Sequence, residues 1–338
     1  PFHVNGQDVS IGASVGIAVL HVDSADPLEI VKFADTAMYA AKQAGRGQIA
    51  FYSREMSKLA RDRTKLEAEL REAIHSGQLR VHFQPKINIR HVRLAGVEAL
   101  VRWQHPTRGL LAPGHFIAVA EQTGLIEDLG NEVLRLSIQQ CRRWFEQNIN
   151  IRISINVCHL QFRRLDFADN VLRMIQAASI PPSMIELELT ETVAMENPEF
   201  SKRHLIKLRA AGVRISVDDF GTGYSNLSQL VQLPFDTLKI DKSMLDNIRH
   251  DKKAGHVVTA IINMAKALGY ETVAEGVEQK EQFAFLYKRG CDIVQGYLFA
   301  RPMDVDALMA WRKLYLKKPA EAPPMPEKPI AVVFSKVA

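Results

Sequence analysis

The segment 79–316 alternates short apolar stretches with amphipathic ones, and this alternation limits the possible folds more than any other feature. Amphipathic stretches such as NEVLRLSIQQCRRWFEQ and HVVTAIINMAKALG carry apolar residues at helical spacing. Strands that alternate with helices and are continuously apolar are typical of a parallel sheet covered by helices. Eight strands over this length predict a (β/α)8 barrel. The eight apolar stretches are VHFQP, AGVEALVRW, RISINV, IELELT, RISVDD, TLKID, TVAEG and DIVQGYLF.

The connection between the first two strands departs from this pattern. Only the stretch INIRHVRL, residues 87–94, separates them, and it is too short for a helical crossover. These two strands should therefore be antiparallel. The expected fold class is α/β, a modified TIM barrel with an antiparallel first strand, over residues 79–316.

The residues before this barrel do not suffice for a core of their own. We expect a strand at 9–20, an amphipathic helix at 27–45 and a short strand at 48–53. Residues 1–53 are therefore expected to be the remainder of a partial α/β domain that is cut on its N-terminal side. Because the chain begins with Pro rather than Met, we expect the true N-terminus to lie elsewhere.

Two connecting segments complete the predicted domain organisation. Residues 54–78 are highly charged and predict a linker helix, whose apolar residues lie near heptad spacing. This helix either packs on a partner helix or is a solvated connector, and the sequence leaves both interpretations open. Residues 317–338 are rich in Pro and predict an extended or disordered tail. The apolar residues of the linker helix are Leu59, Leu66, Leu70 and Ile74.

Composition excludes several classes of protein. The 338 residues are 47% hydrophobic and 24% charged, which is ordinary for a globular protein. The net charge of +5 is mildly basic, but no Lys/Arg run is interleaved with aromatic residues, so we predict no binding of a nucleic-acid polymer. Three cysteines without a CxxC motif favour a reducing, cytoplasmic location. We find neither a signal peptide nor an apolar stretch of ~18 residues, and so predict no membrane contact for this piece.

Polar side chains stand at the carboxyl ends of nearly all predicted barrel strands, where barrels of this type carry their chemistry. One strand-end carboxylate alone is more often structural than functional. Here, however, Arg102 and Lys239 are the only cations expected nearby, so the carboxylates cannot all be partners in ion pairs. These strand-end residues are Glu98, Arg102, Asn156, Glu188, Glu191, Asp218, Asp219, Lys239, Asp241, Glu275, Glu278 and Gln295.

The stretch RISVDDFGTGYSNL places two aspartates side by side before a glycine-containing loop. A solvated turn would explain this pattern, and so would a cation between the carboxylates. The convergence of carboxylates favours the cation, and oxygen ligands from Glu, Asp and Asn suit Mg²⁺, Mn²⁺ or Ca²⁺. Two such ions ~3.5–4 Å apart would activate water and hold a phosphoryl group. Asp218 is placed to bridge them and Asp219 to bind the second.

The motifs VEALVRW, ELTET, VDDFGTGYSNLSQL, LKID, AEGVE and QGYLFARP together resemble those of EAL-domain cyclic di-GMP phosphodiesterases, in the same order over residues 79–316. The resemblance implies a modified TIM barrel and hydrolysis of cyclic di-GMP to linear pGpG. The stretches SIGASVGIAV and ADTAMYAAKQAGRGQIAFY resemble the end of a GGDEF diguanylate cyclase domain. The GGDEF signature itself is not in this chain, so the resemblance does not imply cyclase activity for it.

The resemblance also implies roles for individual residues. Lys239 would orient or polarise water, Glu191 would support the loop after DDFGTG, and Glu275 is a candidate base as well as a ligand. The catalytic set is thus Glu98, Lys239, Glu275 and Glu191. The residues implied to hold the first metal are Glu98, Asn156, Glu188 and Asp218. Those implied to hold the second are Asp218, Asp219 and Glu275. The residues expected to contact the nucleotide are Gln84, Leu100, Arg102, Asp219 and Gln295.

The family further implies two Mg²⁺ or Mn²⁺ ions per site, inhibition by Ca²⁺, and a homodimer formed through the barrel near the segment DDFGTGYSNLSQLVQLPFD. Two alternatives remain. A non-catalytic cyclic di-GMP receptor would be expected to lack metal ligands, and none of the implied ligand positions departs from the family pattern. A scaffold that only contacts other proteins would bind no nucleotide.

Overall fold

The computed structural model describes residues 2–4, 7–9, 11–221, 231–246, 248 and 251–317. The chain divides into two compact units, Pro1–Glu72 and Ala73–Ala338, which are described separately. The division falls within helix α2 (Arg54–His75), which occupies the segment predicted as a linker helix. The individual domain limits drawn from the sequence stay predictions. In α2, Leu59 is exposed, whereas Leu70 and Ile74 are buried.

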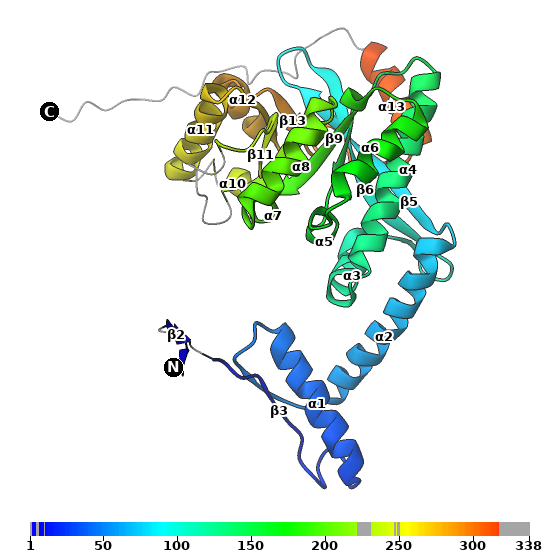
Figure 1. The fold of residues 1–338 in the computed structure, drawn as a ribbon, viewed down its shortest axis with the longest axis vertical. Coiled ribbons are helices and arrows are strands. Elements are labelled where there is room, and N and C mark those ends of the chain that lie inside the picture. The colour runs from blue at the N-terminus through cyan, green and yellow to red at the C-terminus, as the bar shows by residue number, and fades with distance from the viewer. Residues whose placement is uncertain are drawn as a thin grey trace, which may run out of the picture. The chain divides into compact units, whose positions relative to one another are not determined.

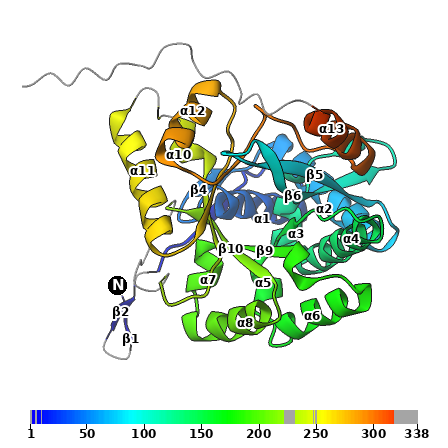
Figure 2. The ribbon, with the colours of Figure 1, turned by 90° about the horizontal axis from the view of Figure 1, so that it is seen from above.

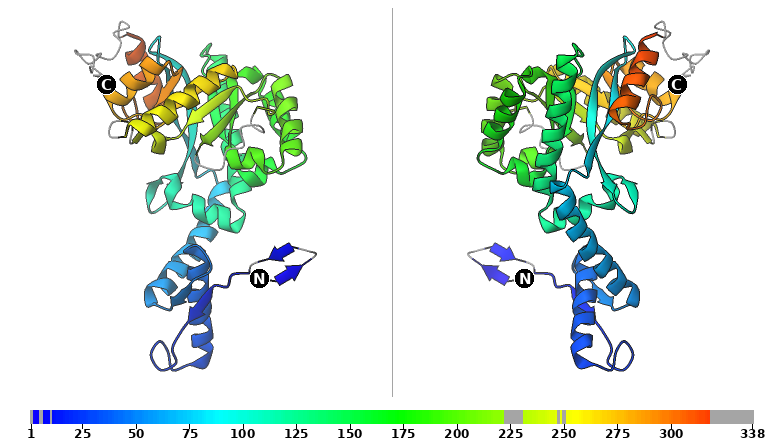
Figure 3. Two further views of the ribbon diagram at one scale, coloured as in Figure 1. Left: turned by 90° about the vertical axis from the view of Figure 1, so that its left-hand side faces the viewer. Right: turned by 90° about the vertical axis from the view of Figure 1, so that its right-hand side faces the viewer.

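The first unit is a small α/β arrangement. Its strands pair as two ladders, β1 with β2 antiparallel and β3 with β4 parallel, and α1 (Pro27–Gln43) packs on the second ladder. Figure 3 shows α1 beside this ladder. The strand expected over 9–20 is largely wrong, because the ladder that it forms with β4 is confined to Val15–Ile17. The partner strand β4 is itself only three residues long, so it can pair no more. The strands are β1 (Phe2–Val4), β2 (Gln7–Val9), β3 (Val15–Ile17) and β4 (Ile49–Phe51).

The second unit contains a closed barrel of eight strands. The order is β5-β13-β12-β11-β10-β9-β8-β6, and β6 also pairs with β5, which closes the ring. Strand β5 is antiparallel to both of its neighbours, and the other barrel pairs are parallel. The predicted fold class and the antiparallel first strand are confirmed. The barrel strands are β5 (Leu79–Asn88), β6 (Arg93–His105), β8 (Ile153–Asn156), β9 (Ile185–Thr190), β10 (Arg214–Phe220), β11 (Thr237–Ile240), β12 (Glu271–Ala274) and β13 (Ile293–Gln295).

Helices surround these strands (Figures 1 and 2). A short strand β7 (Gly109–Leu111), which the sequence pattern did not predict, extends β6 as an antiparallel hairpin. No helix in the described ranges is both long and apolar enough to cross a membrane. The helices of this unit are α3 (Ile117–Thr123), α4 (Ile126–Glu146), α5 (His159–Phe162), α6 (Phe167–Ala178), α7 (Glu191–Met195), α8 (Pro198–Ala210), α10 (Lys242–Asp246), α11 (Lys252–Ala267), α12 (Lys280–Arg289) and α13 (Val305–Lys317), with the 3-10 turns η1 (Pro113–His115) and η2 (Pro182–Met184).

Strand β9 shows how the barrel separates apolar from polar side chains. Its residues Ile185, Leu187 and Leu189 are completely buried. Because side chains alternate along a strand, the residues between them point to the other face, into the barrel. There Glu186 and Glu188 accept hydrogen bonds from polar groups of β5, β8 and β11. The apolar face therefore packs under the helices, and the barrel interior is left polar.

Candidate active site

A cluster of polar side chains, most of them buried, fills the barrel interior, and we call it the central cluster. Its members come from seven of the eight barrel strands and from the residue that follows β12. Hydrogen bonds and ion pairs connect them into two groups, one around Lys239 and one around Glu98. The central cluster consists of Gln84, Lys86, Glu98, Asn156, Glu188, Asp218, Lys239, Glu275 and Gln295.

Lys239 is the centre of the first group. Its Nζ lies 2.6 Å from Glu188 Oε2, 2.8 Å from Asp218 Oδ2 and 2.6 Å from Glu275 Oε1. The first two contacts are hydrogen bonds. The third is an ion pair outside hydrogen-bonding geometry, which leaves the buried Glu275 Oε1 without a hydrogen-bond partner. Burial lowers the pKa of Lys239, but the three carboxylates outweigh this effect and raise it well above its usual value.

Glu98 is the centre of the second group. Its Oε1 accepts a hydrogen bond from Asn156 Nδ2 at 2.7 Å, and its Oε2 accepts one from Gln295 Nε2 at 2.6 Å. Gln295 Nε2 also donates to Gln84 Oε1 at 3.0 Å. Gln84 lies directly opposite Glu98 in the β5–β6 ladder. Two neutral donors, one from β8 and one from β13, thus hold the two oxygens of this buried carboxylate.

Negative charge is in excess within the central cluster. Burial raises the pKa of Glu98, and burial together with neighbouring carboxylates raises the pKa of Glu275 to about 8. For Glu188, burial acts in the same direction, but Lys239 and Lys86 outweigh it and lower the pKa to about 2. The two buried lysines therefore stabilise the ionised form of Glu188. The surroundings of Glu98 and Glu275, in contrast, oppose ionisation.

The end of β10 explains how two adjacent aspartates are accommodated. The β10–β11 register is irregular between Val217 and Phe220. Asp219 has a φ of 54°, a left-handed conformation that Asp adopts more readily than most residues. Its backbone N–H donates to Asp218 Oδ1 at 2.9 Å. Burial and the neighbouring Asp218 raise the pKa of Asp219. The two carboxylates are thus adjacent in sequence but leave the strand at an irregular turn.

Glu191 connects this turn to the start of α7. It is buried, and its Oε2 accepts a hydrogen bond from the backbone N–H of Gly221 at 3.3 Å. The rest of the loop that the sequence assigns to Glu191, residues 222–230, lies outside the described residues. The predicted role of Glu191 in supporting that loop therefore stays a prediction beyond Gly221.

The strand-end residues Arg102, Asp241 and Glu278, and the expected nucleotide contact Leu100, make none of the hydrogen bonds described above around Lys239 and Glu98. Arg102 is half-buried and donates to the carbonyl oxygen of Val101 at 2.7 Å, and Leu100 lies opposite His82 in the β5–β6 ladder. Asp241 accepts from the backbone N–H of Ser243 at 2.9 Å. Glu278 pairs with Lys242 at 2.7 Å on the exposed surface. The hydrogen bond of Asp241 and the ion pair of Glu278 are thus made with nearby residues of α10.

The expectation that Arg102 and Lys239 are the only cations near the carboxylates is wrong. Lys86 Nζ donates to Glu188 Oε1 at 2.5 Å and to Ser154 Oγ at 2.6 Å. Lys86 lies outside the pattern of polar residues at the carboxyl ends of parallel strands. Because β5 is antiparallel to both of its neighbours, its residues run along the barrel in the opposite direction. The available signal was that Lys86 stands two residues after Gln84 and so shares its face.

The chemistry of the central cluster fits a hard divalent cation. In the described ranges, no three His, Cys, Asp or Glu side chains already converge as a formed ligand set. The donors are nonetheless carboxylate and amide oxygens, which Mg²⁺ and Mn²⁺ prefer. Glu98 and Glu275 have raised pKa values, and Glu275 Oε1 is buried without a hydrogen-bond partner. A bound cation would favour the ionised forms of Glu98 and Glu275, and it would give Glu275 Oε1 a partner.

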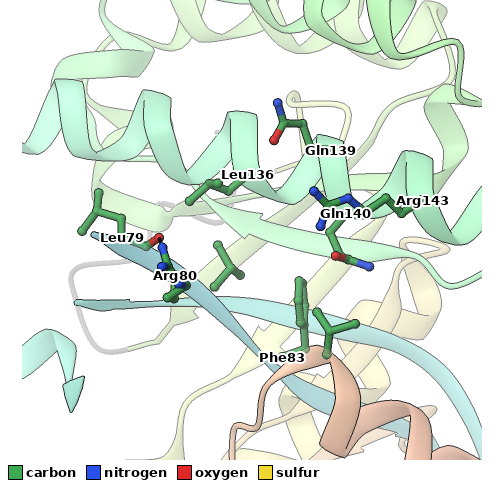
Figure 4. Close-up of a pocket in the computed structure, with 9 residues that line it drawn as sticks. Leu79, Arg80, Phe83, Leu136, Gln139, Gln140 and Arg143 are labelled. Carbon is green, nitrogen blue, oxygen red and sulfur yellow. Dashed lines mark hydrogen bonds between the residues drawn. The ribbon is translucent and has the colours of Figure 1, made fainter. Parts of the chain in front are cut away.

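A separate pocket lies outside the barrel wall, between β5, α4 and the start of α13. It has a volume of about 330 Å³. Its floor includes Leu79, Val81 and Phe83, which alternate with Gln84 and Lys86 and so face away from the central cluster. Figure 4 shows Gln139, Gln140 and Arg143 of α4 around it. This pocket is therefore distinct from the central cluster.

Gly296 is predicted to be essential for the packing that holds Gln295. A β-carbon at this position would overlap the backbone carbonyl oxygen and amide nitrogen of Val277. The backbone N–H of Val277 also donates to the backbone carbonyl oxygen of Gln295 at 2.9 Å, which restrains this segment. We expect Gly296→Ala to destabilise the protein by about 1–3 kcal/mol, as overpacking does. Thermal unfolding measures the loss.

Gly114→Ala is the matched control, because an added β-carbon there meets no atom within 4 Å. The control should melt close to the unchanged protein. Equal melting temperatures for the two variants would show that the backbone around Val277 adapts at little cost.

Comparison with known families places this barrel among described domains. The family model "EAL domain" matches residues 67–302, and the model "Diguanylate cyclase, GGDEF domain" matches residues 1–48. The chain is 40% identical over 311 residues to the bifunctional diguanylate cyclase/cyclic di-GMP phosphodiesterase MucR of Pseudomonas aeruginosa, covering 92% of this chain and 45% of that protein. It is 38% identical over 318 residues to the cyclic di-GMP phosphodiesterase PdeR of Escherichia coli, covering 94% of this chain and 48% of that one.

Solved structures agree with this placement. The PaMucR phosphodiesterase in complex with c-di-GMP is 41% identical, with a TM-score of 0.69, and the match covers 72% of this chain and 99% of that one. The EAL enzyme Bd1971 in its cAMP- and cyclic-di-GMP-bound form is 32% identical, with a TM-score of 0.70, covering 75% and 69%. The present chain spans less than half of the length of MucR and PdeR.

Proposed function

This chain belongs to the EAL-domain family, preceded by the C-terminal part of a GGDEF domain, and we propose on that premise that it hydrolyses cyclic di-GMP to linear pGpG with the help of divalent cations. The observation that supports the proposal most is the convergence of Glu98, Glu188, Asp218 and Glu275 in the barrel interior. Two of these carboxylates have raised pKa values and call for a cation. Hydrolysis would lower the level of this second messenger in bacterial signalling.

The residues proposed to hold the ions are those that the family pattern implies. One ion would be held by Glu98, Asn156, Glu188 and Asp218, and the other by Asp218, Asp219 and Glu275. Divalent ions, when bound in such sites, lower the pKa of a water ligand and polarise phosphoryl oxygens. Asn156 is exposed at the end of β8, so this side of the cluster is open to solvent.

Lys239 orders the carboxylates in this proposal. Its ammonium group has three N–H donors, and two of them are directed at Glu188 and Asp218. The third remains for Glu275 or for a water molecule at the cluster. The same carboxylates raise the pKa of Lys239 well above its usual value and so favour the charged form of the side chain.

The neutral and cationic residues near the cluster suit a cyclic dinucleotide. Gln84 and Gln295 form a hydrogen-bonded pair beside Glu98, and Gln84 Nε2 also donates to the carbonyl oxygen of Ala300. Arg102 supplies a half-buried positive charge on β6 that can attract a phosphate group. We propose that these residues, with Leu100 and Asp219, contact the nucleotide.

Metal removal tests the proposal directly. In the presence of Mg²⁺ or Mn²⁺ the chain should convert cyclic di-GMP to pGpG, and chromatography measures the pGpG formed. Excess EDTA should abolish turnover, and Mn²⁺ added beyond the EDTA should restore it. When Ca²⁺ replaces Mg²⁺ or Mn²⁺, we expect no turnover of cyclic di-GMP.

The alternative reading, a cyclic di-GMP receptor, gives a different result in the same assay. Calorimetry would then detect nucleotide binding, and no pGpG would form with either metal. A scaffold would give neither binding nor turnover. The predicted homodimer depends partly on residues 222–230, which lie outside the described residues, and it stays a prediction, as does the cytoplasmic location.

A further inference from the structure

Lys86 is a buried cation to which the proposed mechanism assigns no role. It lies on β5, only 2% exposed, and reaches across the barrel interior to β8 and β9. Its contacts end on Glu188, a proposed metal ligand, rather than on the nucleotide side of the cluster. The question is whether Lys86 only neutralises charge or prepares Glu188 for its ligand.

The two oxygens of Glu188 are held by two different lysines. Lys86 Nζ donates to Oε1 at 2.5 Å, and Lys239 Nζ donates to Oε2 at 2.6 Å. Two donors on opposite oxygens fix the plane of a carboxylate as well as its position. Each oxygen of a carboxylate has two lone pairs, so each retains one in a set direction.

Lys86 is in turn held by groups beneath it, which we call the anchoring layer: Ser154, Glu186 and Thr237. Lys86 Nζ donates to Ser154 Oγ at 2.6 Å, and Ser154 Oγ donates to Glu186 Oε2 at 2.8 Å. Thr237 Oγ1 donates to Glu186 Oε1 at 2.7 Å. Lys86 Nζ also lies 4.0 Å from Glu186 Oε2. The lysine is therefore restrained on both sides.

We propose that Lys86 is a positioning residue that orients Glu188 for binding a divalent cation. This inference depends on the part of the proposed function in which Glu188 is a metal ligand. It does not depend on which substrate is cleaved. Groups that hold a metal ligand from behind commonly contribute about 10–100-fold to metal affinity or activity.

The test compares Lys86→Met with Lys207→Met. Met has a similar length and removes the charge that holds Glu188. Lys207→Met makes the same chemical change at an exposed lysine of α8, whose ion pair with Asp169 lies outside the central cluster and the anchoring layer. Calorimetric titration with Mn²⁺ alone, without nucleotide, measures metal affinity in each variant, and thermal unfolding in EDTA confirms that each is folded.

We expect Mn²⁺ to bind Lys86→Met about 10–100-fold more weakly, and Lys207→Met with nearly unchanged affinity. Turnover by Lys86→Met should recover at high Mn²⁺. If Lys86→Met does not fold, Lys86→Gln, which keeps a donor but not the charge, is held to the same criterion. Unchanged Mn²⁺ affinity in a folded Lys86 variant would overturn the inference, as would an equal loss in Lys207→Met.

The outcomes separate this inference from the proposed function. A wild-type chain that binds Mn²⁺ but cleaves no cyclic di-GMP, with weakened Mn²⁺ binding in Lys86→Met, would support the positioning role and reject the hydrolase. Full hydrolysis with an unaffected Lys86→Met would do the reverse. A wild-type chain that takes up no Mn²⁺ would overturn both.

Discussion

Replacing Glu98 with Gln is expected to reduce hydrolysis of cyclic di-GMP by at least about 10²–10³-fold, the loss typical of one group that stabilises the transition state directly. The substitution keeps the shape of the side chain and removes its charge. It also turns one oxygen into an NH₂ group, which would face the donor Asn156 Nδ2 or Gln295 Nε2. The loss should appear in kcat at saturating Mn²⁺, measured as pGpG formed with time.

The control for this variant is Glu121→Gln on α3, where the carboxylate is exposed. It makes the same chemical change at a residue outside the central cluster, and its turnover should match that of the unchanged chain. Retention of full activity by a folded Glu98→Gln variant would mean that Glu98 is not a ligand and that the metal assignment is mistaken.

Replacing Lys239 with Met is expected to lower both stability and activity. The change leaves Glu188, Asp218 and Glu275 without the cation they share. Breaking a buried ion pair by removing one partner costs about 3–5 kcal/mol, because the remaining charge stays buried without compensation. In EDTA, thermal unfolding of the variant should shift downward by on the order of 10 °C. Turnover should be lost, because the side chain proposed to order the carboxylates and the water is absent.

Metal adds a second, distinguishing readout for Lys239→Met. Mn²⁺ should raise the melting temperature of the variant less than that of the unchanged chain, because the carboxylates proposed to bind the ion are no longer ordered by the lysine. Lys242→Met is the matched control, since its ion pair with Glu278 is solvent-exposed and such pairs contribute about 0–1 kcal/mol. A Lys239→Met variant as stable in EDTA as the Lys242→Met control would contradict the charge balance inferred for the cluster.

Several features of the fold follow from local patterns alone. The alternation of apolar strands with amphipathic helices predicts the barrel, because each kind of element buries its apolar face only against the other. The eight-residue connection at 87–94 predicts the antiparallel β5, since no helix fits in it. Period-two alternation also predicts which residues of β9 and β10 face inward. The sequence therefore suffices to predict most of the carboxylates and amides that form the central cluster.

Other features depend on how the strands are staggered and on which groups meet across the barrel. Alternation assigns a residue to a face but not to a depth, and for this reason Lys86, on the reversed strand, was missed. Asp241 and Glu278 follow their strands as Glu275 does, yet they turn to local partners on α10 and the surface. The irregular turn at Asp219 results from the register between β10 and β11. Residue types and spacing thus determine the barrel and its polar interior, whereas strand register, a long-range property, determines which carboxylates meet Lys86 and Lys239.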